Sequence, residues 1–217
     1  MNRKILCAAA GLLAVFPVMA HTINYALQDA PVSEVAAYYF QLGFKHIIPE
    51  GLDHVLFIIG LCLIHTKIKP IIYQATAFTV AHTIALALSM KNIIVAPPQV
   101  IEPIIALSIV FIALENLIVS KAKPWRLILV FLFGLVHGMG FASSLNEIGL
   151  PPNQFATSIL LFNLGVEVCQ VLIIAFVYGL LILPFNNRQW YRGRIVYPIS
   201  IMIAVVSSYW TVMRIME

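Results

Sequence analysis

The sequence predicts an all-α membrane protein in which a bundle of six transmembrane helices follows a cleaved signal peptide. Three observations support this fold class. Apolar residues make up 61% of the 217 residues and charged residues only 10%, whereas soluble domains are about a quarter charged. Long apolar runs recur along the chain, and basic residues gather in alternate connections between them. The composition therefore excludes a soluble enzyme, a disordered tail and a nucleic-acid-binding domain.

Residues 1–20 have the parts of a secretory signal peptide: a basic start, an apolar stretch and the small-residue ending Val18-Met19-Ala20. The apolar run is interrupted by Pro17 and is short for a span of about 20 residues. Both features disfavour the alternative, an uncleaved first transmembrane helix. Cleavage after Ala20 leaves His21 at the mature N-terminus, either as a ligand that captures metal outside the cytoplasm or as a chance terminal residue.

The mature chain is predicted to have two parts. Residues 21–45 form an extracytoplasmic segment, whose apolar and aromatic stretch 35–44 suits an interfacial helix. Residues 46–217 form the six-span transmembrane domain, in which each span has the about 20 residues needed to cross about 30 Å of hydrocarbon. The predicted spans cover about residues 47–65, 71–90, 100–119, 126–145, 155–184 and 195–213.

The basic residues orient these spans through the positive-inside rule. They lie mainly in the first, third and fifth connections, which share one side of the membrane: Lys67, Lys69, Lys121, Lys123, Arg126, Arg188, Arg192 and Arg194. The second connection has Lys91 alone and the fourth has none. We therefore expect a bacterial inner-membrane protein with both mature termini on the periplasmic side.

Five acidic residues fall within or at the edge of the predicted spans, where a carboxylate is costly and marks a functional site. No Lys or Arg falls deep in a span, so we expect these acids to lack basic partners there. Protonation, hydrogen bonding or a bound cation must then stabilise them. They are Glu50, Asp53, Glu102, Glu115 and Glu167.

The first predicted span carries two of the histidines. His46, Glu50, Asp53 and His54 are separated by four, three and one residues. On a single helix this spacing places them along one face. Pro49 is compatible with such a helix if it belongs to the first turn, where a missing N–H costs little.

Three histidines are predicted to meet at one depth. A rise of about 1.5 Å per residue places His54, His82 and His137 about 10–12 Å below the outer ends of their spans. Glu102 then lies above this level, and Glu167, which shares a helix face with Asn163, lies somewhat below it. Imidazole and carboxylate ligands suit nickel, zinc or copper better than calcium or magnesium. The alternative is a set of hydrogen-bonding contacts between helices.

Two further groups of residues lie near these histidines. Glu115 and Asn116 fall in the inner half of the third span and form either an inner relay, to which Asn163 also belongs, or a polar packing cluster. Gly134, Gly138 and Gly140 surround His137 and predict a close approach between helices there.

The run GLDHVLFIIGL (51–61) resembles the GxDH signature of the HupE/UreJ family of hydrogenase and urease accessory membrane proteins. His46 and Pro49 resemble the His-Pro pair that precedes this signature, here spread to His46-Ile47-Ile48-Pro49. The stretches 76–88, 101–117 and 133–145 are similar to the second branch of the family. The resemblance implies six spans after a signal peptide and permeation of nickel, or cobalt, toward metalloenzyme maturation. By this resemblance Asp53, His54 and His46 match the metal-motif positions.

Two function classes follow. The first is a permease that moves a divalent transition metal inward, with nickel favoured and zinc, cobalt or copper as alternatives. Its metal residues are Asp53, His54, His82, His137, His46, Glu50, Glu102 and Glu167. The second is an intramembrane zinc hydrolase, in which histidines hold the metal and Glu102 or Glu167 is the base. A membrane assembly protein that uses the metal only structurally is a third reading. Possible partners of a permease are metalloenzyme maturation proteins.

Overall fold

The computed structural model describes residues 27–217, and all regular structure in this range is helical. The predicted signal peptide and His21 lie outside the described residues. The helices are α2 (Val32–Ile47), α3 (Leu52–Leu63), α4 (Ile68–Met90), α5 (Pro98–Ile118), α6 (Arg126–Ile148), η3 (Pro152–Gln154), α7 (Phe155–Val177), η4 (Tyr178–Ile182), η5 (Arg192–Val196) and α8 (Tyr197–Met216).

The fold class is confirmed: the protein is an all-α membrane protein. Five helical segments in the described range are long and apolar enough to cross a membrane. They agree within a few residues with the second to sixth predicted spans. These segments are Ile68–Met90, Pro98–Ile118, Arg126–Ile148, Pro152–Ile182 and Arg192–Met216.

The first predicted span is not a single helix. Helices α2 and α3 are bent by 70° at a short break between them. Pro49, which the sequence places in the first turn of a helix, lies in this break, and Gly51 precedes α3. A helix of 12 residues is about 18 Å long, too short to cross about 30 Å of hydrocarbon alone.

The bent pair nevertheless connects the two ends of the bundle. Ala30 lies just before α2, and its carbonyl accepts a hydrogen bond from the side-chain amide of Gln154, which lies just before α7. Just after α3, His65 lines the same cavity as Lys123 of the α5–α6 connection. Counted as one broken span, α2 and α3 supply the sixth crossing.

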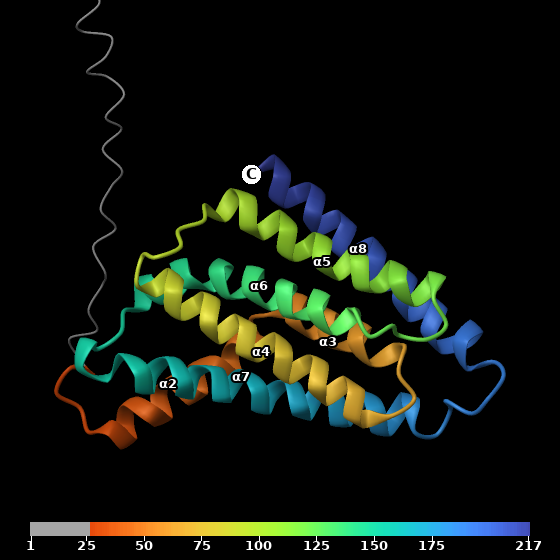
Figure 1. Cartoon of the computed structure of the whole chain (residues 1–217), viewed down its shortest axis with the longest axis horizontal. Coiled ribbons are helices and arrows are strands. Elements are labelled where there is room, and N and C mark those ends of the chain that lie inside the picture. The colour runs from red at the N-terminus through yellow and green to blue at the C-terminus, as the bar shows by residue number, and fades with distance from the viewer. Residues whose placement is uncertain (1–26) are drawn as a thin grey trace, which may run out of the picture.

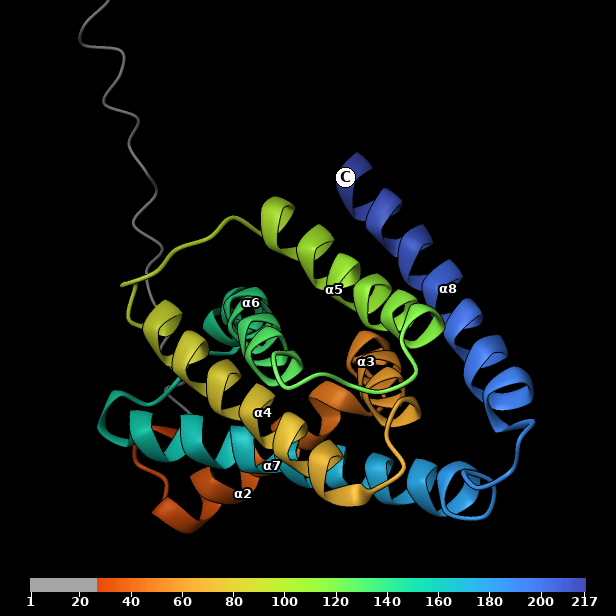
Figure 2. The same ribbon diagram turned by 45° about the vertical axis from the view of Figure 1, so that its right-hand side comes forward.

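The remaining helices surround α3. Helix α4 packs along α6, α5 along α8, and α2 along α7, while α3 contacts α2, α4, α5, α7 and α8. Figures 1 and 2 show α3 in the middle of this arrangement. The segment expected to be an interfacial helix is thus packed against α7. Helix α3 carries the Asp53-His54 pair, and side chains from the helices around it can reach this pair.

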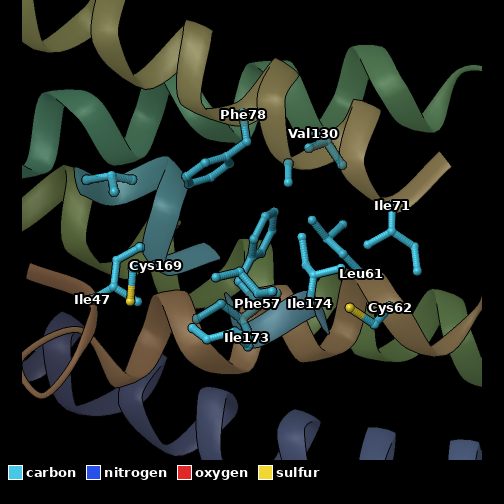
Figure 3. Close-up of a cluster of buried hydrophobic side chains, with 14 of the residues drawn as sticks. Ile47, Phe57, Leu61, Cys62, Ile71, Phe78, Val130, Cys169, Ile173 and Ile174 are labelled. Atoms are coloured by element: carbon cyan, nitrogen blue, oxygen red, sulfur yellow. The ribbon is translucent and has the colours of Figure 1, made fainter. Parts of the chain in front are cut away.

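Apolar side chains fill the space between α3, α4 and α7. Phe57 of α3 and Phe78 of α4 have ring centroids 5.0 Å apart. Ile173 and Ile174 of α7 belong to the same cluster of buried side chains (Figure 3). Lipid tails are as apolar as these side chains, so van der Waals packing and not the hydrophobic effect holds such helices together. This dense packing fixes the histidines that lie beside it.

Candidate metal centre

Four histidine rings from four helices form one buried cluster. His46 ends α2, and its ring centroid lies 4.7 Å from that of His54 in the first turn of α3. His82 of α4 lies 6.2 Å from His54 between centroids. His137 of α6 lies 5.1 Å from His54 on another side. His54 is therefore the member that touches all the others.

The helix break places His46 beside His54. The prediction that both lie on one face of a single helix is wrong, because they lie on either side of the 70° bend. Glu50, expected on the same face, lies in the break and is exposed. A Cβ atom at Gly51 would overlap the backbone carbonyl of His46. Glycine therefore lets the chain fold back closely enough for the two rings to meet.

The orientation of His82 is set by an amide on α7. The Nδ1 atom of His82 lies 2.9 Å from the Oδ1 atom of Asn163. The amide nitrogen of Asn163 donates to the carbonyl of Ile159 at 2.8 Å, which turns the amide oxygen toward His82. An amide oxygen only accepts hydrogen bonds, so the proton of the neutral ring is on Nδ1. Asn163, which the sequence assigned to an inner relay, thus belongs to the histidine cluster.

The rings of His137 and His54 are fixed in the same way. His137 donates from Nδ1 to the backbone carbonyl of Phe133 at 2.8 Å. The Nδ1 atom of His54 lies 3.0 Å from the Oδ1 atom of Asp53, and the same oxygen accepts the backbone N–H of His54 at 2.8 Å. In this geometry Asp53 orients a histidine through its second nitrogen. Metal-ligating histidines are typically held by such contacts.

In each of the four histidines, the Nε2 atom is buried and has no hydrogen-bond partner. A buried polar atom without a partner costs about 1–3 kcal/mol, so four in one cluster need an explanation. His46, His54 and His82 each offer a ligand atom, and these atoms lie within 4.8 Å of one another. Two nitrogens bound at about 2.1 Å to one ion lie at most about 4.2 Å apart. The three ligand atoms therefore need to draw together only slightly to bind one transition-metal ion, and His137 is not part of this closest group.

Aromatic rings enclose the cluster. The ring of Phe141 lies 3.9 Å from that of His46 between centroids, and Phe141 stacks on Phe162 at 4.8 Å. Phe78 lies 4.9 Å from His137. On the sides of the cluster that these rings cover, the apolar surroundings strengthen the interaction between a cation and its ligands.

A cavity of about 360 Å³ leads to the cluster from the end of the bundle opposite the lysine-rich connections. Three acidic residues and one arginine line it together with the histidines. The charged and imidazole side chains of its wall are Glu50, Asp53, Glu102, Arg214, His46, His54 and His137. The excess of acids makes this cavity favourable for a cation.

Two of the intramembrane acids have basic partners, so the expectation that they lack them is wrong. The Nη2 atom of Arg214 lies 3.4 Å from the Oδ2 atom of Asp53. The Nε atom of Arg126 lies 3.4 Å from the Oε2 atom of Glu115. Both arginines stand at helix ends, but their long side chains reach inward, and that of Arg126 is completely buried.

The other predicted residues lie at different levels. Glu167 accepts a hydrogen bond from the hydroxyl of Thr76 at 2.7 Å. Thr76 precedes His82 by six residues on α4, about 9 Å along the helix. At the opposite end of α3, Asn116 donates to the carbonyl of Gly60 at 2.8 Å. Glu115 and Asn116 are thus not part of the histidine cluster.

Glycines bring α4 and α6 together at the level of the site, as the sequence predicts. A Cβ atom at Gly138 would overlap the carbonyl of His82, and one at Gly134 would overlap the carbonyl of Phe78. Gly140 instead faces the side chains of Ile105 and Ile101 of α5. Close backbone contact is therefore what sets the separation of His82 and His137.

Sequence reasoning missed Arg214, the role of Asn163 and the aromatic contact of Phe141. A signal for Arg214 was present, because the predicted topology places the end of the last span and the start of the third span, with Glu102, on the same side. The arginine donates to the backbone carbonyl of Glu102 at 3.2 Å. Nothing in the sequence marks Phe141 among the other phenylalanines.

The fold and the cluster together define a multi-pass membrane protein with a candidate site for a divalent transition metal. The model of the family described as HupE / UreJ protein matches residues 22–214. The chain therefore belongs to the HupE/UreJ family, which is associated with the handling of nickel or cobalt at a membrane. Comparisons with curated proteins and with solved structures found no match.

Proposed function

We propose that this protein carries a divalent transition metal, nickel in the first place, across the bacterial inner membrane into the cytoplasm. The observation that carries this proposal is the set of four buried, unpartnered Nε2 atoms on four helices. Their Nδ1 partners hold three of the rings in the tautomer that presents a lone pair. A metal ion is the ligand that satisfies several such nitrogens at once.

Transport, as opposed to a fixed structural or hydrolytic metal, is supported by polar side chains at successive depths. Glu50 and Glu102 line the cavity of about 360 Å³ described above, called the outer cavity from here on. The histidine cluster lies at its base. Glu167 is hydrogen bonded to Thr76, about 9 Å further along α4. Glu115 lies at the opposite end of the bundle. A carrier needs ligands at several levels, whereas a hydrolase needs one closed site with a base beside it.

The inward direction rests on the distribution of charge. The acidic cavity opens at one end of the bundle, and Lys67, Lys121 and Lys123 line cavities at the other. Positive residues face the cytoplasm in most inner-membrane proteins. The acidic cavity is then on the periplasmic side, where it collects cations, and the metal would be released toward cytoplasmic metalloenzyme maturation proteins.

The choice of nickel rests on ligand type and on the family. Imidazole nitrogens suit nickel, copper, zinc and cobalt and disfavour calcium and magnesium. Several of these ions bind the same donors, so cobalt, zinc and copper remain alternatives. The family association with nickel and cobalt handling ranks these two metals above the others.

Uptake into proteoliposomes with a trapped nickel-sensitive dye tests the proposal. The variants H54Q and H82Q should lower nickel uptake at least about tenfold, because each removes an Nε2 ligand. H65Q is the matched control, since His65 lies outside the cluster and bonds Gln74. Thermal unfolding should show that all three variants fold. Unchanged uptake in H54Q and H82Q would refute the central site. Metal bound by the native protein without uptake would favour the hydrolytic or structural alternatives.

A further inference from the structure

Among the described residues that line the cavity beside the histidine cluster, Arg214 is the one arginine or lysine. It lies in the last turn of α8, with a side chain 25% exposed. Its Nη2 atom is 3.4 Å from Asp53, and its Nη1 atom donates to the carbonyl of Glu102 at 3.2 Å. The arginine therefore spans the entrance between α3 and α5.

Asp53 connects this arginine to the histidine cluster. One carboxylate oxygen of Asp53 contacts Arg214 and the other contacts Nδ1 of His54. A carboxylate that is paired with a guanidinium is a weaker acceptor for the Nδ1–H group of the imidazole. The ring is then less basic, and its Nε2 atom is a weaker metal ligand. The positive charge of Arg214 also repels a cation that enters the cavity.

We propose that Arg214 is an affinity-setting residue: a tethered cation that holds Asp53 in the metal-free protein and keeps metal binding weak enough for release. This inference rests on the proposed transport function. A transport site must bind its ion well enough to load it and weakly enough to let it go. Without Arg214, three acids and no arginine or lysine remain among the described residues that line the cavity, which favours retention of a divalent ion.

Calorimetric titration of the purified protein with nickel ions alone tests this role. R214Q and R214M should lower the Kd for nickel by about tenfold, and R214Q should lower the maximal rate of uptake into proteoliposomes. R214K keeps the charge and should bind within about threefold of the native protein. R194Q is the matched control, because Arg194 is an exposed arginine beside the opposite end of α8.

A merely structural role for Arg214 predicts the opposite sign. If Arg214 only fastens α8 to α5, its neutral replacement loosens the site and raises the Kd or leaves it unchanged, and either result would overturn the inference. Failure of both R214Q and R214M to fold would also overturn it, since it would make the arginine a structural anchor.

The two proposals fail in different ways. Absence of nickel binding and uptake in the native protein refutes the transport function and this inference with it. Nickel binding and uptake in the native protein, without tighter binding in R214Q, refutes only the role of Arg214.

Discussion

The Nδ1 atom of His82 and the Oδ1 atom of Asn163 lie 2.9 Å apart across the interface of α4 and α7. This contact joins the long apolar α7 to the candidate metal centre through two uncharged side chains. It gives a metal ligand its orientation without adding a charge to the membrane interior, where a charge is expensive.

N163A should therefore weaken metal binding without removing a ligand. The ring of His82 loses its acceptor and becomes free to turn, and loss of such a contact typically lowers metal affinity about 10–100-fold. Calorimetric titration with nickel measures the change. N153A is the control, because Asn153 is an exposed asparagine in η3, at the start of the same apolar segment. Equal affinities of N163A and the native protein would contradict the role of the hydrogen bond.

G138A should separate α4 from α6 at the level of the site. The new methyl group meets the carbonyl of His82, and overpacking of this kind costs about 1–3 kcal/mol. A lower unfolding temperature together with weaker nickel binding is the expected result. In G179A the methyl group meets no atom within 4 Å, so this control should be as stable as the native protein. Full stability of G138A would show that the two helices can move apart at little cost.

The buried pair of Glu115 and Arg126 should be sensitive to the loss of one partner. E115Q leaves the fully buried Arg126 without a counter-ion, which costs about 3–5 kcal/mol in comparable pairs. The double variant E115L/R126M removes both charges and should recover most of this loss. Unfolding titrations in mixed detergent micelles measure the difference. If the double variant is as unstable as E115Q, the loss comes from packing and not from the unpaired charge.

Acid should destabilise the protein through His65, which lies in the connection between α3 and α4. Burial, and second the positive charge of Arg126, lower the pKa of His65 from its ordinary value of 6.5 to about 4. The unfolded chain therefore takes up this proton at a higher pH than the folded chain. Stability from this group is complete above pH of about 6.5 and is lost as the pH falls toward about 4.

H65Q isolates this contribution. Its unfolding temperature should fall less between pH 7 and pH 5 than that of the native protein, because the titrating group is gone. Gln74, which bonds His65 at 2.8 Å, and Arg126 are unchanged in this variant. Identical pH dependence in the two proteins would rule out a contribution from His65.

Most of the fold follows from local features of the sequence. Apolar length and the bias of basic residues locate the second to sixth crossings within a few residues, because hydrocarbon thickness sets the length of each span. The break after α2 does not follow from them. Pro49 is as compatible with the first turn of a helix as with a break, and it is packing against α7, more than 100 residues later, that accompanies the break.

The sequence predicted how deep in the membrane the site lies, but not the contacts between its side chains. Helical rise places His54, His82 and His137 at one level, and the structure brings their rings together. His46 was expected on the same helix face as His54, but its ring joins the cluster from the other side of the bend. Helix rotation and the direction of long side chains depend on the neighbouring helices. The pairing of Arg214 with Asp53 therefore appears only in three dimensions.

The short length of α3 has a consequence for biosynthesis. A helix of 12 residues is too short to remain across a bilayer by itself, and α2 finds its main partner in α7. The ribosome makes α7 about 100 residues later, so the first crossing cannot take its final form when it leaves the tunnel. The contacts between α2 and α7 can form only after α7 has been made. Asn163, which orients His82, also lies on α7, so the metal centre lacks part of its contacts until that helix is present.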